Sequence, residues 1–348
     1  MSFSLPRRLY ADLYGPGEGD RIRLGDTSLL ARVERSAIPV GEEGLIGAGR
    51  NIRDGMVATA STARESALDV CVKSAVVLDP VLGVLKADIG IKDGRIAAVG
   101  HAGNPDVQDQ VDMTLDTNTG VLPAAGLIAT PGAIDTHVHL LTGALMDVYL
   151  ALGYTTLIGG SAGLMFDVGT NPRWVLERMF ESLAGLPINV AFVGRAASTA
   201  APLEEMLSWG VSGFKIHEDL GAYPSVIDNT LTVADDHDVQ VLIHTDTMNE
   251  SVSLEDTIAA IAGRTIHAYH VEGAGGGHSP DLLEIVSEPN VLTSSTNPTN
   301  PFTAGAVKEH LDMIMSVHQL KPQIPEDLAF AQARVRPETM AAEDALHD

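Results

Sequence analysis

The pattern of apolar and polar positions divides the chain into two parts. Residues 1–125 hold short β-type runs separated by glycines and charged residues. One of them, Ala87–Val99, carries an Asp-Gly pair in its middle, which is typical of a two-residue hairpin turn. We therefore expect a β-rich domain over residues 1–125. From residue 126 onwards, apolar strand-like runs alternate with segments of helical periodicity, as in parallel α/β sheets.

Residues 126–348 contain seven strand-like runs. The expected strands are 127–139, 153–159, 187–194, 211–217, 238–245, 264–270 and 290–295, and the expected helices are 173–184, 202–209, 224–236, 254–262 and 280–287. An α/β fold of the (β/α)8-barrel type fits this alternation best, with about seven strands and thus incomplete by one. Functional sites of such barrels lie at the carboxyl ends of the strands.

Composition and charge narrow the class of protein. Of the 348 residues, 45% are hydrophobic, which is enough for a sizeable core. The single cysteine, Cys71, excludes a disulfide framework and fits a reducing compartment. Met1–Arg8 lacks the apolar segment of a signal peptide, and no apolar run approaches the length of a membrane span. The net charge of −24 argues against binding to nucleic acid. We expect a cytoplasmic protein that binds neither nucleic acid nor membranes.

Two histidines, His137 and His139, stand at the end of the first barrel strand. Alternate side chains of a strand point to the same face, so both imidazoles project together. Two converging imidazoles can bind a metal ion. A pair of unrelated polar residues at a strand end is the alternative interpretation, and further candidate ligands downstream decide between the two.

Those further candidates end three more strands. Lys215 and His217 end the fourth strand, His244 ends the fifth, and His270 ends the sixth. A glycine-rich loop over residues 273–277 follows His270 and lacks the spacing and the lysine of a phosphate-binding loop. One such histidine alone would be interpreted as a core residue. Lysine among metal ligands makes sense if carbon dioxide converts its amine into an anionic carbamate that bridges two metal ions.

Candidate ligands at the same end of four strands predict one shared site. We interpret it as the two-metal centre of a hydrolase, in which metal ions polarise a carbonyl and lower the pKa of a bound water to roughly 7. Nitrogen and oxygen ligands do not choose among zinc, nickel, iron, cobalt and manganese.

The chain closely resembles the alpha (catalytic) subunits of urease, within the amidohydrolase superfamily. The stretches that carry this resemblance run in register along nearly the whole chain: Arg7–Tyr10, Gly19–Thr27, Gly132–His139, Lys215–Asp219, His244–Thr247, His270–His278 and Ser294–Pro298.

The resemblance implies two nickel ions bridged by carboxylated Lys215. His137 and His139 would bind one nickel together with Lys215, and His244 and His270 would bind the other. It further implies urea as the substrate, and smaller urease subunits, nickel-loading accessory proteins and other copies of the chain in an oligomer as partners.

The resemblance also implies roles in catalysis. His217 is similar to the residue that hydrogen-bonds the urea carbonyl oxygen, and Gly275 lies in the loop that faces the substrate. His318 is similar to the acid/base histidine of a mobile flap, here about residues 303–335. Arg334 would position the flap network, and Asp219 would be the partner of His318.

Three departures from the family pattern are visible. Val317 replaces the cysteine that usually precedes the flap histidine, and residues 161–172 replace a glycine-rich loop. The family also continues beyond the equivalent of Asp348 into an eighth strand that carries an aspartate ligand. We therefore expect a second polypeptide to supply that strand. Two alternatives remain open, a non-catalytic paralogue that acts in assembly and an amidohydrolase for another small amide.

Overall fold

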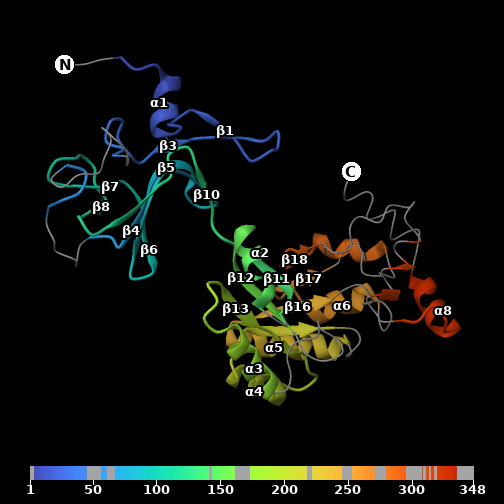
Figure 1. Cartoon of the computed structure of the whole chain (residues 1–348). Helices are drawn as coiled ribbons and strands as arrows, with labels where there is room; N and C mark the ends of the chain where they lie inside the picture. The colour runs from blue at the N-terminus through green and yellow to red at the C-terminus, as the bar shows by residue number, and fades with distance from the viewer. Residues whose placement is uncertain are drawn as a thin grey trace. The chain divides into compact units, whose positions relative to one another are not determined.

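The computed structural model describes most of the chain. The described residues are 4–44, 56–60, 67–140, 143–160, 173–217, 222–244, 253–269, 271, 280–294, 308, 311–312, 315–316 and 320–334. The chain forms two compact units, Met1–Pro131 and Gly132–Asp348, named unit 1 and unit 2 below (Figure 1). In the part of the chain that is described, no helix is long and apolar enough to cross a membrane.

Unit 1 is built around a six-stranded mixed sheet. Its two longest strands, β4 (Val70–Asp79) and β5 (Gly83–Lys92), pair in antiparallel orientation. The sheet is completed by β3 (Arg35–Ser36), β6 (Arg95–Gly100), β9 (Gly120–Pro123) and β10 (Ile128–Ala129). The other elements are α1 (Arg7–Tyr14), the ribbon of β1 (Arg21–Arg23) with β2 (Leu30–Arg32), and the pair of β7 (Ala102–Gly103) with β8 (Met113–Thr114).

The hairpin predicted over Ala87–Val99 is confirmed. Strands β5 and β6 pair antiparallel, with Lys92 opposite Arg95 across a two-residue turn. Both turn residues have positive φ, 50° at Asp93 and 72° at Gly94. That combination matches the right-handed twist of the flanking strands, and Asp-Gly adopts it at little cost.

A buried ion pair lies inside unit 1. Lys73 Nζ is 2.6 Å from Asp88 Oδ2, and both side chains are at most 1% exposed. The Asp88 carboxylate also accepts hydrogen bonds from the backbone N–H groups of Ser74 and Ala102, and Lys73 donates to the Ala102 carbonyl. Buried charges are tolerated when they are paired and hydrogen-bonded in this way.

Unit 2 is an α/β unit of parallel strands. Every paired strand in it is parallel to its neighbour. The strands are β11 (Ala133–His139), β12 (Tyr154–Gly160), β13 (Asn189–Phe192), β14 (Gly194–Arg195), β15 (Gly213–Ile216), β16 (Gln240–His244), β17 (Ile266–Tyr269) and β18 (Val291–Ser294). Sheet order follows chain order, β11-β12-β13 and then β14 through β18.

Strands β13 and β14 occupy a single position in this series. Only Val193 separates them, and its N–H donates to Gly159 O of β12. On the other side, Ala196 N donates to Lys215 O of β15. One interrupted strand thus joins the two sheets, and the described residues provide the seven parallel positions that the sequence predicts for an incomplete barrel.

Helices between the strands cover the core of unit 2 (Figure 1). They are η1 (Gly143–Leu145), α2 (Met146–Ala151), α3 (Arg173–Leu183), α4 (Ala200–Ser208), α5 (Pro224–His237), α6 (Leu254–Ile261) and the 3-10 helix η4 (Pro280–Ser287). One further helix, α8 (Pro325–Arg334), follows the last strand. Buried side chains of α3 to α6 pack on those of the strands in one large apolar cluster, including Leu176, Leu203, Ile227 and Ile261. This packing holds the strand ends in fixed positions.

Two details differ from the elements that we predict. The strand expected over 127–139 is two strands, because β10 pairs with β4 of unit 1 while β11 begins at Ala133. Pro131 lies between them and has no N–H for a sheet ladder. The helix expected over 280–287 has 3-10 geometry. Over eight residues, apolar spacing does not separate periods of 3.0 and 3.6.

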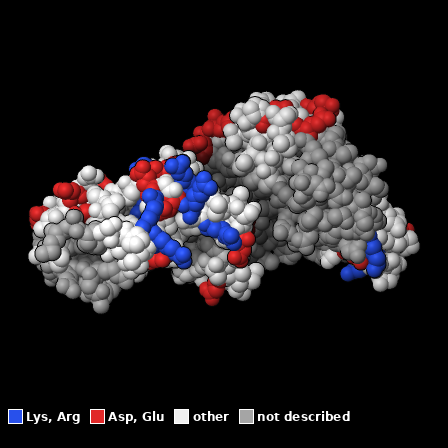
Figure 2. Space-filling model, turned by 90° about the horizontal axis from the view of Figure 1, so that it is seen from above, with Lys and Arg blue, Asp and Glu red and all other residues white. Residues whose placement is uncertain are grey.

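Charge is distributed unevenly between the two units. Residues 132–348 contain 29 Asp and Glu against 9 Lys and Arg. In unit 1, Arg8 of α1, Arg21 and Arg23 of β1 and Arg32 of β2 are exposed, and Lys and Arg side chains gather on the face of unit 1 seen in Figure 2. Most of the net negative charge is therefore carried by unit 2.

Candidate metal centre

The candidate ligands of unit 2 lie on or just after the last residues of parallel strands. His137 is near the end of β11, Lys215 is in β15, and His244 is the last residue of β16. His217 follows the last residue of β15. Lys215 and His217 are only 2% and 5% exposed. Because these strands run parallel within one series, their carboxyl ends bring the side chains to one end of the unit.

Lys215 and His137 form the first contact of this group. Lys215 Nζ lies 3.5 Å from His137 Nε2, although the two residues belong to different sheets of unit 2. Tyr269, at the end of β17, adjoins both of them. Its ring stacks on the His137 ring with 4.2 Å between centroids and 6° between planes, and Lys215 Nζ lies 4.0 Å from its centroid.

His217 and His244 form the second contact. The distance from His217 Nε2 to His244 Nδ1 is 2.8 Å, and the rings meet edge to face at 88°. A hydrogen bond of this kind needs one nitrogen to donate and the other to accept, so at least one of the two facing nitrogens is unprotonated. Lys215 and His217 are two residues apart, so β15 supplies one member of each contact.

His267 and Tyr269 also lie at the site, although neither is among the residues predicted from the sequence. His267 Nε2 lies 2.9 Å from Ser294 Oγ, and its Nδ1 lies 3.5 Å from Thr136 Oγ1. Burial lowers the pKa of His267 to about 4, with a further contribution from the charges of Lys215 and His137. Period-two alternation is the signal that could have found this pair, because it puts His267 and Tyr269 on one face of β17.

Of the other predicted site residues, two lie at the ends of described elements and four lie outside the described part of the chain. His139 is the last residue of β11, and Arg334 is the last residue of α8. The predictions for His270, Asp219, Gly275 and His318, and for most of the flap 303–335, fall outside the described residues. Within the described ranges, no three His, Cys, Asp or Glu side chains are close enough together to hold one ion.

The donors of the two contacts fit borderline divalent metal ions. Neutral imidazole nitrogens are suitable ligands for nickel, zinc and copper. A protonated lysine would repel a cation, whereas a carbamate on Lys215 would place a negative charge next to His137 Nε2. The lysine is therefore the residue whose chemical state decides whether this arrangement binds metal.

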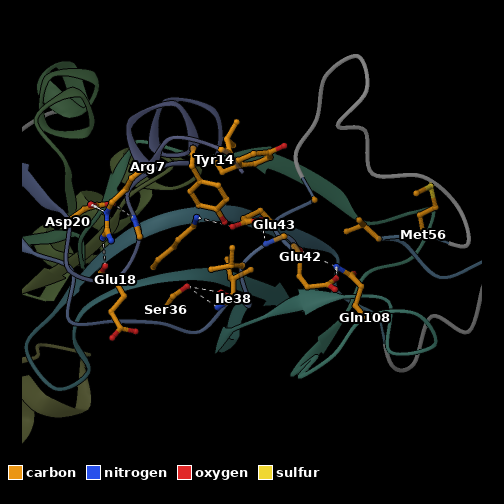
Figure 3. A pocket seen from close by; sticks show the side chains of 18 of the residues that line it. Arg7, Tyr14, Glu18, Asp20, Ser36, Ile38, Glu42, Glu43, Met56 and Gln108 are labelled. Atoms are coloured by element: carbon orange, nitrogen blue, oxygen red, sulfur yellow. Dashed lines mark hydrogen bonds and ion pairs between the residues drawn. The ribbon is translucent and has the colours of Figure 1, made fainter. Parts of the chain in front are cut away.

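A separate cavity of about 1130 Å³ lies in unit 1 (Figure 3). Lys86 and Glu43 are both buried there, with 3.4 Å between their charged atoms, and Arg7 pairs with Asp20 at 2.6 Å. Burial lowers the pKa of Lys86, and Glu43 opposes that shift. None of the predicted site residues lines this cavity.

Comparison with known families decides the class of unit 2. Residues 128–348 match the amidohydrolase family. The chain belongs to the amidohydrolase family. In addition, residues 3–122 match the family described as "Urease alpha-subunit, N-terminal domain". The two matches together cover both units.

Curated relatives of this amidohydrolase agree with the resemblance found in the sequence. The chain is 53% identical to urease subunit alpha of Sulfurisphaera tokodaii over 348 residues, which cover 99% of this chain and 62% of that protein. It is 49% identical to urease subunit alpha of Haloquadratum walsbyi, over 100% of this chain and 62% of the relative. The predicted resemblance to urease alpha subunits is confirmed, and the chain spans about 62% of the length of these two relatives.

Solved structures give a weaker match. D-hydantoinase from Thermus sp. aligns with a TM-score of 0.46 and 19% identity, over 69% of this chain and 62% of that chain.

Proposed function

We propose that this chain is a urease alpha-type subunit that hydrolyses urea to ammonia and carbamate at a pair of nickel ions. The observation that carries the proposal is the approach of Lys215 Nζ to within 3.5 Å of His137 Nε2, with the His217–His244 contact on the neighbouring strand ends. A buried lysine among histidines has little use as a cation, and it has a clear use as a carbamate ligand.

The carbamate forms from the neutral amine of Lys215. Its nitrogen adds to the carbon of carbon dioxide, an N–C bond forms, and one proton is released to solvent. The carbamate group on Lys215 would supply anionic oxygen donors for both ions. His137 and His139 would complete the protein ligands of one nickel, and His244 and His270 those of the other. When bound, the ions would supply Lewis-acid polarisation of the urea carbonyl and activation of water.

The remaining residues act on the substrate and its protons. His217 donates a hydrogen bond to the urea carbonyl oxygen, and the loop that contains Gly275 faces the substrate. His318 transfers a proton as general acid or base, for which a pKa near the working pH is best. Asp219 would be the partner of His318 in this step, and Arg334 would help to position the flap network.

The partners follow from the relatives, which are named as subunits. We propose that the chain assembles with smaller urease subunits in an oligomer in the cytoplasm, with nickel-loading proteins delivering the metal. We also propose that the chain is specific for urea over other small amides. This part needs a test of its own, because residues 161–172 differ from the usual family loop.

The test is activity and metal content of the complete protein, produced with its partner subunits and nickel-loading proteins. We expect two nickel ions per chain and release of ammonia from urea, with little release from formamide or acetamide. A parallel preparation without nickel should be inactive. A protein that binds no nickel and acts only in assembly would overturn the proposal. Faster hydrolysis of another amide would show that urea is not the preferred substrate.

A further inference from the structure

Tyr269 is the aromatic residue on which the first pair of site residues rests. It is 1% exposed and ends β17. The His137 ring stacks on the Tyr269 ring, with 4.2 Å between the ring centroids and 6° between the ring planes. Lys215 Nζ lies 4.0 Å from the same ring centroid. A single side chain on β17 therefore touches candidate ligands from β11 and from β15.

The Tyr269 ring is itself held at both ends. Its hydroxyl donates a hydrogen bond to the carbonyl oxygen of Thr136, the residue before His137. Its ring packs in a small buried apolar cluster with Val193 and Leu242. Buried side chains in such close packing occupy one rotamer, because rotation would require neighbouring groups to move. The ring plane is thus fixed relative to the backbone of β11.

We propose that Tyr269 is a positioning residue for the metal pair, a role that rests on the proposed function. The fixed ring plane sets the plane of the His137 imidazole and directs its Nε2 towards Lys215. The same ring supports the end of the Lys215 side chain at the place where the carbamate forms. Without the ring, the His137 and Lys215 side chains can adopt more conformations in the metal-free protein. Ordering them when metal binds then costs conformational entropy, which weakens metal affinity.

The expected size of the effect follows from other metal sites. Groups that orient a metal ligand without touching the metal contribute about 10- to 100-fold to metal affinity or activity. The flat ring carries this role, because it makes both contacts. The hydroxyl contributes through one hydrogen bond to Thr136, so phenylalanine should preserve most of the function.

The experiment compares Tyr269→Leu and Tyr269→Met with Tyr269→Phe in the complete protein with its partner subunits. Nickel affinity and stoichiometry are measured together with thermal unfolding of the metal-free protein, kcat and KM. The matched control is Phe192→Leu, since Phe192 of β13 is also fully buried but packs on Phe180 of α3 at 4.9 Å. It loses an aromatic ring from the same unit without touching the site.

We expect Tyr269→Leu and Tyr269→Met to weaken nickel binding about 10- to 100-fold, with kcat lowered more than KM is changed. Tyr269→Phe should restore nickel binding to within a few-fold of the parent. Phe192→Leu should lower the unfolding temperature and leave nickel affinity unchanged. Parent-like nickel binding in folded Tyr269→Met, or an equal loss in Phe192→Leu, would overturn the positioning role while leaving the proposed function intact. A parent protein that binds no nickel would overturn both.

Discussion

Lys215 Nζ lies 3.5 Å from His137 Nε2, although the two residues are 78 positions apart in the sequence. The contact exists because β11 and β15 end on the same side of unit 2. It brings together two residues that would each be ordinary alone, and they form the first part of the proposed metal site.

Replacing Lys215 by alanine should abolish binding of the metal pair. The carbamate is the only ligand proposed to bridge both ions, and its loss leaves each ion short of an anionic donor. Metal analysis of the purified Lys215→Ala protein, with circular dichroism to show that the fold persists, checks this. Lys92→Ala in unit 1 is the control, since Lys92 lies outside the site and donates to Ala67 O. Metal content equal to that of the parent would remove Lys215 from the ligand set.

Replacing His318 by alanine should separate binding from chemistry. As a proton-transfer residue outside the ligand set, His318 should contribute roughly 10²- to 10⁴-fold to turnover and nothing to metal content. Turnover and nickel are measured on the same preparation. If nickel is lost together with activity, His318 is a ligand and not an acid or base.

The pKa of His267 predicts a stability change in mild acid. Its pKa is lowered to about 4 by burial and the nearby charges of Lys215 and His137, from an ordinary value of 6.5. Between these two values the unfolded chain binds more protons than the folded chain, so stability falls as pH drops from about 6.5 towards 4. His267→Asn removes this titration, and the unfolding temperature of the metal-free protein should then vary less with pH over that window. An unchanged pH dependence would show that other groups control acid unfolding.

The fold could be predicted from periodicity because the pattern in unit 2 is simple. Its strands are buried, parallel and separated by helices, and α6 even begins with a capping box between Ser253 and Asp256. The hairpin at Asp93 and Gly94 followed from turn chemistry. The break at Pro131 is not visible in the apolar pattern, since the apolar run continues across it and only the missing N–H of proline separates β10 from β11.

The residues of the candidate site that can be predicted from the sequence are those whose side chains can bind metal or transfer protons. Residues with ordinary core side chains cannot be predicted in this way. His137, Lys215, His217 and His244 are conspicuous at strand ends, and the structure brings them together in two pairs. In the sequence Tyr269 resembles an ordinary core aromatic residue, and its proposed role depends on a ring orientation that no sequence pattern encodes. Contacts between strands that are far apart in the chain supply that information.

The most direct test of the account is X-ray diffraction from crystals of the nickel-loaded complete protein, with anomalous data at the nickel absorption edge. We expect two anomalous peaks flanking Lys215, one beside His137 and the other beside His244, with density for a carboxylate on the lysine nitrogen. Peaks elsewhere, a single peak, or an unmodified lysine between well-occupied metal sites would contradict it.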